Sequence, residues 1–102
     1  MTAVSKKTNN MNEISALIRS EKTTIVDVRT PGEFAGGHVA GSINIPLDEL
    51  PRRMDEFKKM DQIVLCCLSG GRSGQATMFL KQNGIDCVNG GPWTEVNFYK
   101  NN

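Results

Sequence analysis

The sequence contains no hydrophobic run long enough to cross a membrane, because charged or polar residues interrupt every apolar stretch. Its first residues also lack the apolar segment of a secretory signal, since Lys6 and Lys7 are followed by polar residues. We therefore expect no membrane association and no secretory leader. Residues 1–10 are mostly polar, and we expect them to form a disordered tail in front of the domain.

Cysteine and histidine are scarce, which limits the metal and disulfide chemistry open to the chain. Three cysteines without a CxxC pair, and a single histidine, supply neither the clustered ligands of a zinc site nor the pairs of a disulfide framework. An odd number of cysteines instead indicates free thiols, which persist in a reducing compartment. We therefore expect a cytoplasmic protein that needs no metal and no other cofactor.

An excess of charge of one sign is also absent. Lys and Arg number 12 against 11 Asp and Glu, and they are spread along the chain, so no strongly positive surface for nucleic acid is expected. A length of 102 residues is near the lower end of sizes that bury a core without disulfides or metal. We predict one domain over residues 11–100.

Segments rich in β-branched residues alternate with segments of helical periodicity. Strands are expected over residues 23–28, 42–45, 63–66 and 85–88. Helices are expected after Asn12, after Thr30, within residues 47–59, over residues 73–82 and from Trp93 onward. This alternation predicts an α/β fold with a central parallel sheet of four or five strands and helices on both faces. Ligands of such sheets bind at the carboxyl ends of the strands.

Local signals predict the ends and buried faces of these helices. Asn12 is predicted to be the N-cap of the first helix, and Thr30 with Glu33 has the form of a capping box. Gly84 is predicted to end the helix over residues 73–82. In the last helix, the residues expected to pack on the core are Trp93, Val96 and Phe98.

In residues 63–73 an apolar strand ends on a cysteine, turns through glycines and leads into a helix. The first amides of a helix have no acceptor within it, and with the positive end of the helix dipole they stabilise an anion in the preceding loop. Cys67 is therefore expected to have a lowered pKa and to be a nucleophile near neutral pH. Gly70 and Gly71 let several amides converge on one point, and Arg72 adds a positive charge.

Burial in the core is the alternative interpretation of each cysteine, because cysteine is among the most buried residue types. Side chains alternate along a strand, so Cys66 and Cys67 are expected on opposite faces. With Cys67 at the loop, we predict a structural role for Cys66 and a reactive role for Cys67. Cys87 falls in the last predicted strand and is expected to be buried.

Four short segments carry recognisable patterns: residues 27–34 (DVRTPGEF), 37–46 (GHVAGSINIP), 67–73 (CLSGGRS) and 90–93 (GGPW). In type and order they resemble the signatures of a single-domain rhodanese, a member of the thiosulfate sulfurtransferase-like family. Any one segment alone is a weak signal, but the four in order span nearly the whole chain. The resemblance implies a rhodanese-like fold and a sulfurtransferase activity.

The resemblance also implies a mechanism. Cys67 would attack the outer sulfur of thiosulfate or a similar donor, release sulfite and hold a persulfide. A second nucleophile, such as cyanide, a thiol or a sulfur-accepting protein, would then remove that sulfur. The residues expected to bind the anionic persulfide or the donor are Leu68, Ser69, Gly70, Gly71, Arg72 and Ser73.

Other polar residues of the first two signatures receive structural interpretations. Asp27 and Arg29 lie at the end of a buried strand and are expected to pair with each other. Glu33 is assigned to helix capping and His38 to the scaffold. Gly41 is assigned to a turn, and Asn44 to backbone pairing.

Two other functions stay open. A Cdc25-like phosphatase or arsenate reductase also uses a thiolate and an arginine, but it would have five residues between them, whereas four (68–71) separate Cys67 from Arg72. The shorter ring suits one sulfur atom better than a phosphate, and the loop has no acid to protonate a leaving group. A persulfide carrier or an interaction module without turnover is compatible with the sequence, although inactive rhodanese-like domains usually lack the cysteine.

Overall fold

The computed structural model describes residues 11–102, so the tail predicted for residues 1–10 lies outside the described residues. Within them, the elements follow in the order α1 (Met11–Arg19), β1 (Thr23–Asp27), α2 (Pro31–Ala35), β2 (Ile43–Asn44), η2 (Leu47–Arg52, a 3-10 helix), α3 (Met54–Lys58), β3 (Gln62–Cys67), α4 (Gly71–Gln82), β4 (Val88–Pro92) and α5 (Trp93–Lys100). The predicted alternation of strands and helices is confirmed.

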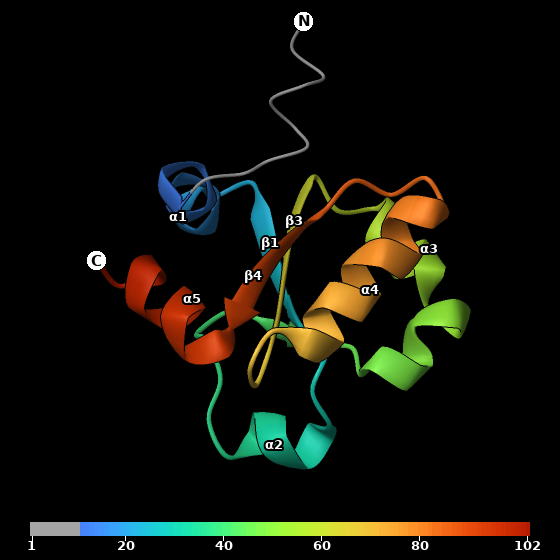
Figure 1. Ribbon diagram of the computed structural model, residues 1–102, viewed down its shortest axis with the longest axis horizontal. Helices are drawn as coiled ribbons and strands as arrows, with labels where there is room; N and C mark the ends of the chain where they lie inside the picture. The colour runs from blue at the N-terminus through green and yellow to red at the C-terminus, as the bar shows by residue number, and fades with distance from the viewer. Residues whose placement is uncertain (1–10) are drawn as a thin grey trace, which may run out of the picture.

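The four strands of the described residues form one parallel sheet in the order β2-β1-β3-β4. Because the strands run the same way, their carboxyl ends meet at one edge of the sheet. Figure 1 shows α2 at this edge, below the loop that joins β3 to α4. The expected place for a ligand is therefore bounded by α2 and by this loop.

Helices cover both faces of the sheet, as predicted. Figure 1 shows α1 and α5 on one side and α3 and α4 on the other. Side chains of β3 alternate between the two cores: Leu65 and Cys67 pack in the cluster that contains Leu80 of α4, whereas Cys66 packs with Val96 of α5. The expected opposite orientation of Cys66 and Cys67 is confirmed.

Several predicted boundaries were wrong. Asn12 lies inside α1, which begins at Met11, and is not its N-cap. The last strand is Val88–Pro92 and not residues 85–88, because the Ile85 amide bonds Leu80 O at the end of α4 and Val88 is the first residue to pair with β3. Phe98 was expected to pack on the core, but it is 60% exposed. The buried face of α5 instead carries Val96 and Tyr99, which are three residues apart in the helix.

Close packing at Gly90 leads to a stability prediction. A Cβ built there would lie 2.7 Å from Val64 Cγ1 and 2.9 Å from Val96 Cγ2. Both valines are fully buried and have no free volume to move into. Gly90→Ala is therefore expected to lower the free energy of unfolding by about 1–3 kcal/mol, the usual cost of overpacking.

Urea unfolding checks this expectation, with Gly32→Ala as the control. A Cβ at Gly32, on exposed α2, would meet no atom within 4 Å. Equal unfolding midpoints for Gly90→Ala and the parent protein would show that β4 packs less tightly than described.

Candidate active site

Cys67 is the last residue of β3, and the loop of residues 68–70 leads directly into α4. Gly70 turns the chain with φ +107° and ψ −14°, a left-handed conformation that glycine adopts readily. This turn directs the Gly70 amide back to the strand, and it donates to Cys67 Sγ at 2.9 Å. The sulfur is enclosed, since Cys67 is 1% exposed, whereas Leu68 beside it is 58% exposed.

Hydrogen bonds change the protonation of the Cys67 thiol. Burial alone would raise its pKa, but the Ser73 hydroxyl, 3.3 Å from Sγ, stabilises the thiolate. Backbone amides of the loop and of the first turn of α4 act in the same direction; they belong to Ser73, Gly70 and Ser69. The balance lowers the pKa of Cys67, so the predicted concentration of donors around this sulfur is present.

The pKa values of the other two cysteines are shifted in the opposite direction. Burial raises the pKa of Cys66 to about 12, and burial also raises the pKa of Cys87 to about 11. Both thiols are free and packed in the cores. Their predicted burial is confirmed, and at neutral pH they are neutral thiols with little nucleophilic character.

Asn89 of β4 holds the loop in place, and the sequence analysis missed it. Its Oδ1 accepts from the Gly91 amide at 2.9 Å and lies 2.7 Å from Ser73 Oγ, whose single proton can be donated either to this oxygen or to the Cys67 thiolate. Its Nδ2 donates to Gly70 O at 3.3 Å. Asn89 is the second residue of β4 and directly follows the strand predicted over residues 85–88. Its place after the end of that predicted strand, where ligands of parallel sheets bind, could have pointed to it.

Asp27 and Arg29 form the expected structural pair. Both are buried, and Arg29 Nη2 lies 2.8 Å from Asp27 Oδ2. The same nitrogen donates to Gly37 O at 2.7 Å, and the guanidinium lies 4.9 Å from the Trp93 ring centroid. This pair therefore connects β1 with the segment after α2 and with α5.

The other structural assignments also agree with the geometry. His38 is exposed, stacks on the Phe34 ring and places Nδ1 2.7 Å from Phe34 O. Gly41 has φ +83°, as a turn residue needs. Asn44 Nδ2 donates to the carbonyls of Asp27 and Arg29, each at 2.9 Å. These three residues shape the scaffold around the loop.

Glu33 does more than the predicted capping. The capping box with Thr30 is present, as expected. In addition, Glu33 Oε1 lies 2.7 Å from Arg72 Nη1, and Glu33 Oε2 lies 3.0 Å from Arg72 Nη2. This pairing, followed by the bond from the Thr30 amide, lowers the pKa of Glu33 to about 2. Arg72, expected to hold an anionic donor, thus has both terminal nitrogens on a carboxylate.

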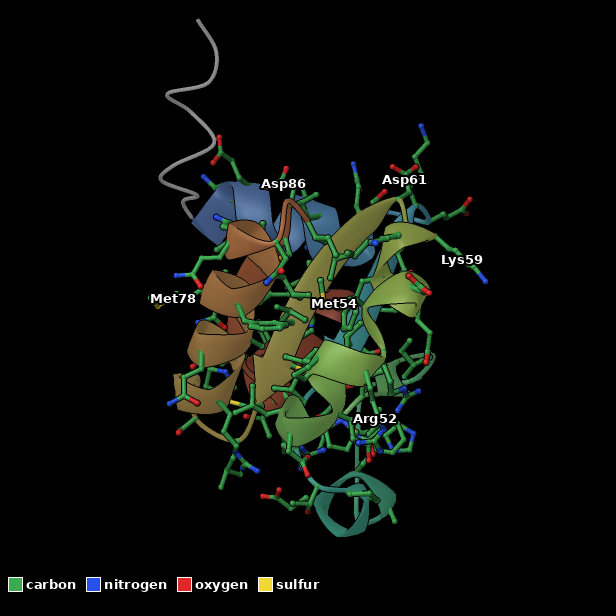
Figure 2. The ribbon with its side chains drawn as sticks, turned by 90° about the vertical axis from the view of Figure 1, so that its right-hand side faces the viewer. Arg52, Met54, Lys59, Asp61, Met78 and Asp86 are labelled. Carbon is green, nitrogen blue, oxygen red and sulfur yellow. The ribbon has the colours of Figure 1, made fainter. Side chains whose placement is uncertain are left out.

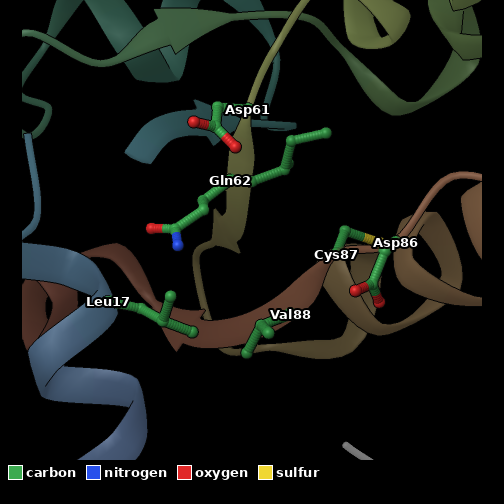
Figure 3. Close-up of a pocket in the computed structure, with 7 residues that line it drawn as sticks. Leu17, Asp61, Gln62, Asp86, Cys87 and Val88 are labelled. Atoms are coloured by element: carbon green, nitrogen blue, oxygen red, sulfur yellow. The ribbon is translucent and has the colours of Figure 1, made fainter. Parts of the chain in front are cut away.

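A cavity of about 150 Å³ lies at the opposite end of the sheet (Figure 3). It is lined in part by Asp61, Asp86 and Cys87. Figure 2 shows Asp61 and Asp86 at the end of the molecule away from α2. Burial keeps the thiol of this cavity, that of Cys87, neutral, so the loop after Cys67 is the better candidate for an active site.

Residues 11–102 form neither a metal cluster nor a membrane-spanning helix. No three His, Cys, Asp or Glu side chains gather closely enough to hold a metal ion. No helix in this part of the chain is long and apolar enough to cross a membrane.

The lowered pKa of Cys67 predicts a selective reaction with iodoacetamide. The thiolate is the reactive form, so the rate should rise with pH through the pKa of Cys67, and its inflection should lie below that of an ordinary cysteine. Cys66 and Cys87 should stay unmodified in the folded protein. Ser73→Ala should move the inflection to higher pH, since it removes a bond to the thiolate.

Mass analysis of the alkylated protein over a pH series measures these rates. Protein unfolded in urea is the control, in which all three cysteines should react in the ordinary pH range. An inflection for folded Cys67 at or above that range would contradict the assigned hydrogen bonds.

Comparison with known proteins identifies the family. The Rhodanese-like domain family matches residues 10–96, which is most of the chain. The chain therefore belongs to the rhodanese-like domain family, as its resemblance implied. The fold prediction is confirmed as well, as a rhodanese-like α/β fold with a parallel sheet of four strands in the described residues.

Individual relatives agree with this assignment. A protein of Allochromatium vinosum named Sulfurtransferase is 40% identical over 72 residues, which cover 71% of this chain and 67% of that protein. The uncharacterized protein YqhL of Bacillus subtilis is 43% identical over 63 residues, which cover 62% of this chain and 50% of YqhL. The match thus spans about half to two thirds of the length of these relatives.

A solved structure has the same fold. The crystal structure of a rhodanese-like domain protein from Staphylococcus aureus superposes with a TM-score of 0.71 at 33% sequence identity. The superposition covers 84% of this chain and 85% of that one.

Proposed function

We propose that this protein is a sulfurtransferase that carries sulfane sulfur on Cys67. The observation that supports this most directly is the set of donors around Cys67 Sγ, namely the Ser73 hydroxyl and the amides of Ser69, Gly70 and Ser73. These donors stabilise the thiolate that attacks the sulfur donor and that forms again when the sulfur is passed on. Membership of the rhodanese-like family and a relative named Sulfurtransferase point to the same chemistry.

The proposed reaction has two steps. The Cys67 thiolate attacks the outer sulfur of thiosulfate or a similar donor, a new S–S bond forms, and the bond to sulfite breaks with its electron pair on the leaving sulfite. A thiol or cyanide then attacks the terminal sulfur, and the electron pair of the broken S–S bond returns to Cys67 as a thiolate. The two steps balance without an oxidant, a metal or a cofactor. Because a persulfide on Cys67 links them, ping-pong kinetics are expected.

The hydrogen bonds of the loop indicate what its residues do in this reaction. The Gly70 amide and the Ser73 hydroxyl bind the sulfur of Cys67, and Asn89 holds both residues in position. Leu68 and Ser69, the two residues that follow Cys67, are exposed, so we place the entry of the sulfur donor beside them. We also propose that the protein works in a reducing compartment such as the cytoplasm, because a thiolate of this kind needs protection from oxidation.

Parallel assays with thiosulfate plus cyanide and with an aryl phosphate test the proposal. We expect formation of thiocyanate and negligible phosphate release. A protein that hydrolyses the aryl phosphate efficiently but takes no sulfur from thiosulfate is a phosphatase, and the proposal is then wrong. A protein that accepts one sulfur but does not pass it to cyanide or to a small thiol is instead a carrier for a protein acceptor.

A further inference from the structure

Arg72 and Glu33 form a bidentate ion pair between the active-site loop and α2. The nitrogen–oxygen distances are 2.7 and 3.0 Å, and the residues are 39 positions apart in the chain. Both side chains are about one third exposed, so the pair lies where solvent and substrate reach it. The guanidinium belongs to the second residue of α4, in the same turn as Ser73, which contacts the reactive sulfur.

Glu33 is held in this position by its own helix. Its Oε1 accepts from the Thr30 amide at 3.0 Å and from Thr30 Oγ1 at 3.1 Å. The carboxylate is therefore fixed before Arg72 binds it, and it stays ionised at neutral pH. An anion that competes for Arg72 must displace a carboxylate already in place.

Arg29, the other arginine at this edge of the sheet, is also engaged by a carboxylate, that of Asp27. A sulfonate group is best bound by a free guanidinium, whose two parallel N–H groups match two of its oxygens. In Arg72 the pair of N–H groups on the two terminal nitrogens is bound to Glu33, whose negative charge also offsets that of the guanidinium.

We propose that Glu33 is a specificity-determining residue, which occupies Arg72 and so disfavours donors with a sulfonate group relative to hydropersulfides of uncharged thiols. This inference rests on the proposed sulfur transfer. With a hydropersulfide R–S–SH, the Cys67 thiolate attacks the outer sulfur, a new S–S bond forms, and the S–S bond of the donor breaks with its electron pair on R–S⁻. The proton of the outer sulfur passes through water to R–S⁻, which leaves as the thiol. The loaded state of Cys67 is the same as with thiosulfate, and no redox reagent is consumed.

Glu33→Gln tests this role, because glutamine at the same position keeps the capping box with Thr30 but removes the negative charge. Second-order rate constants for sulfur loading are measured by intact mass, with thiosulfate and with the hydropersulfide of 2-mercaptoethanol at matched ionic strength. We expect Glu33→Gln to raise the thiosulfate constant about two- to fivefold, as release of one partly exposed ion pair allows. The hydropersulfide constant should change by less than about twofold.

Two further variants separate specificity from structure. Glu56→Gln breaks a similar bidentate pair, that of Glu56 with Arg53 at α3. This variant should leave both constants unchanged. Glu33→Gln combined with Arg72→Gln should lose the gain with thiosulfate, because the freed guanidinium is then absent. A merely structural effect of Glu33→Gln would not be reversed by the second substitution.

The outcomes distinguish the inference from the proposed function. If the parent protein takes sulfur from neither donor, the proposed function fails and the inference fails with it. If the parent loads sulfur but Glu33→Gln changes the two constants by the same factor, or changes neither, only the role of Glu33 is overturned.

Discussion

Cys67→Ser is expected to abolish transfer of sulfur from thiosulfate to cyanide, with a loss of more than about a thousandfold. Serine is close to cysteine in size and keeps an acceptor for the Gly70 amide, so the loop should retain its shape. Its hydroxyl does not ionise near neutral pH and cannot hold a persulfide. Steady-state formation of thiocyanate measures the effect.

Cys66→Ala is the matched control for this substitution. Cys66 neighbours Cys67 in the chain but is fully buried on the other face of the sheet, where burial holds its pKa far above neutrality. Its removal should cost about 1 kcal/mol of stability and leave sulfur transfer intact. If Cys67→Ser keeps the activity of the parent, or Cys66→Ala loses it, the assignment of the nucleophile is wrong.

Gly70→Val is expected to reduce persulfide formation steeply in a protein that still folds. Gly70 has φ +107°, a region that β-branched residues avoid at a cost of about 1–3 kcal/mol. Rotation to a negative φ would relieve the strain and turn the Gly70 amide away from Cys67 Sγ. Loss of one such donor lowers rates by about 100- to 1000-fold in related sites for developing anions.

Gly71→Val separates this conformational effect from the added volume. Gly71 has no positive φ, and a Cβ there would meet no atom within 4 Å. The rate of sulfur loading should therefore fall far less in Gly71→Val than in Gly70→Val. Unchanged loading in folded Gly70→Val would falsify the view that convergent amides stabilise the sulfur.

Local patterns in the sequence were sufficient to predict the strands and helices that carry the loop. The β-branched run that forms β1, the capping box of Thr30 with Glu33 and the Gly70 turn act over a few residues, and each is present as expected. The fourth strand was misplaced because glycines and a proline in Val88–Pro92 have low strand propensity. Pairing with β3 decides its position, and that pairing is a tertiary effect.

The contacts that complete the candidate site also come from distant parts of the chain. Asn89 reaches Ser73 across 16 positions, and Glu33 reaches Arg72 across 39. Neither residue carries a local signal for these contacts, since asparagine before two glycines suggests a turn and Glu33 is already explained by capping. Sequence patterns predicted the nucleophile and its loop. The long-range contacts of Asn89 and Glu33 depend on how distant strands and helices pack, which local patterns do not show.

Intact-mass analysis after treatment with thiosulfate tests the central proposal most directly. The parent protein should gain the mass of one sulfur atom, fragmentation should place that sulfur on Cys67, and cyanide should remove it. Cys66→Ala should show the same gain, and Cys67→Ser should show none. Absence of the gain in the parent protein, or a sulfur on Cys66 or Cys87, would contradict a persulfide on Cys67.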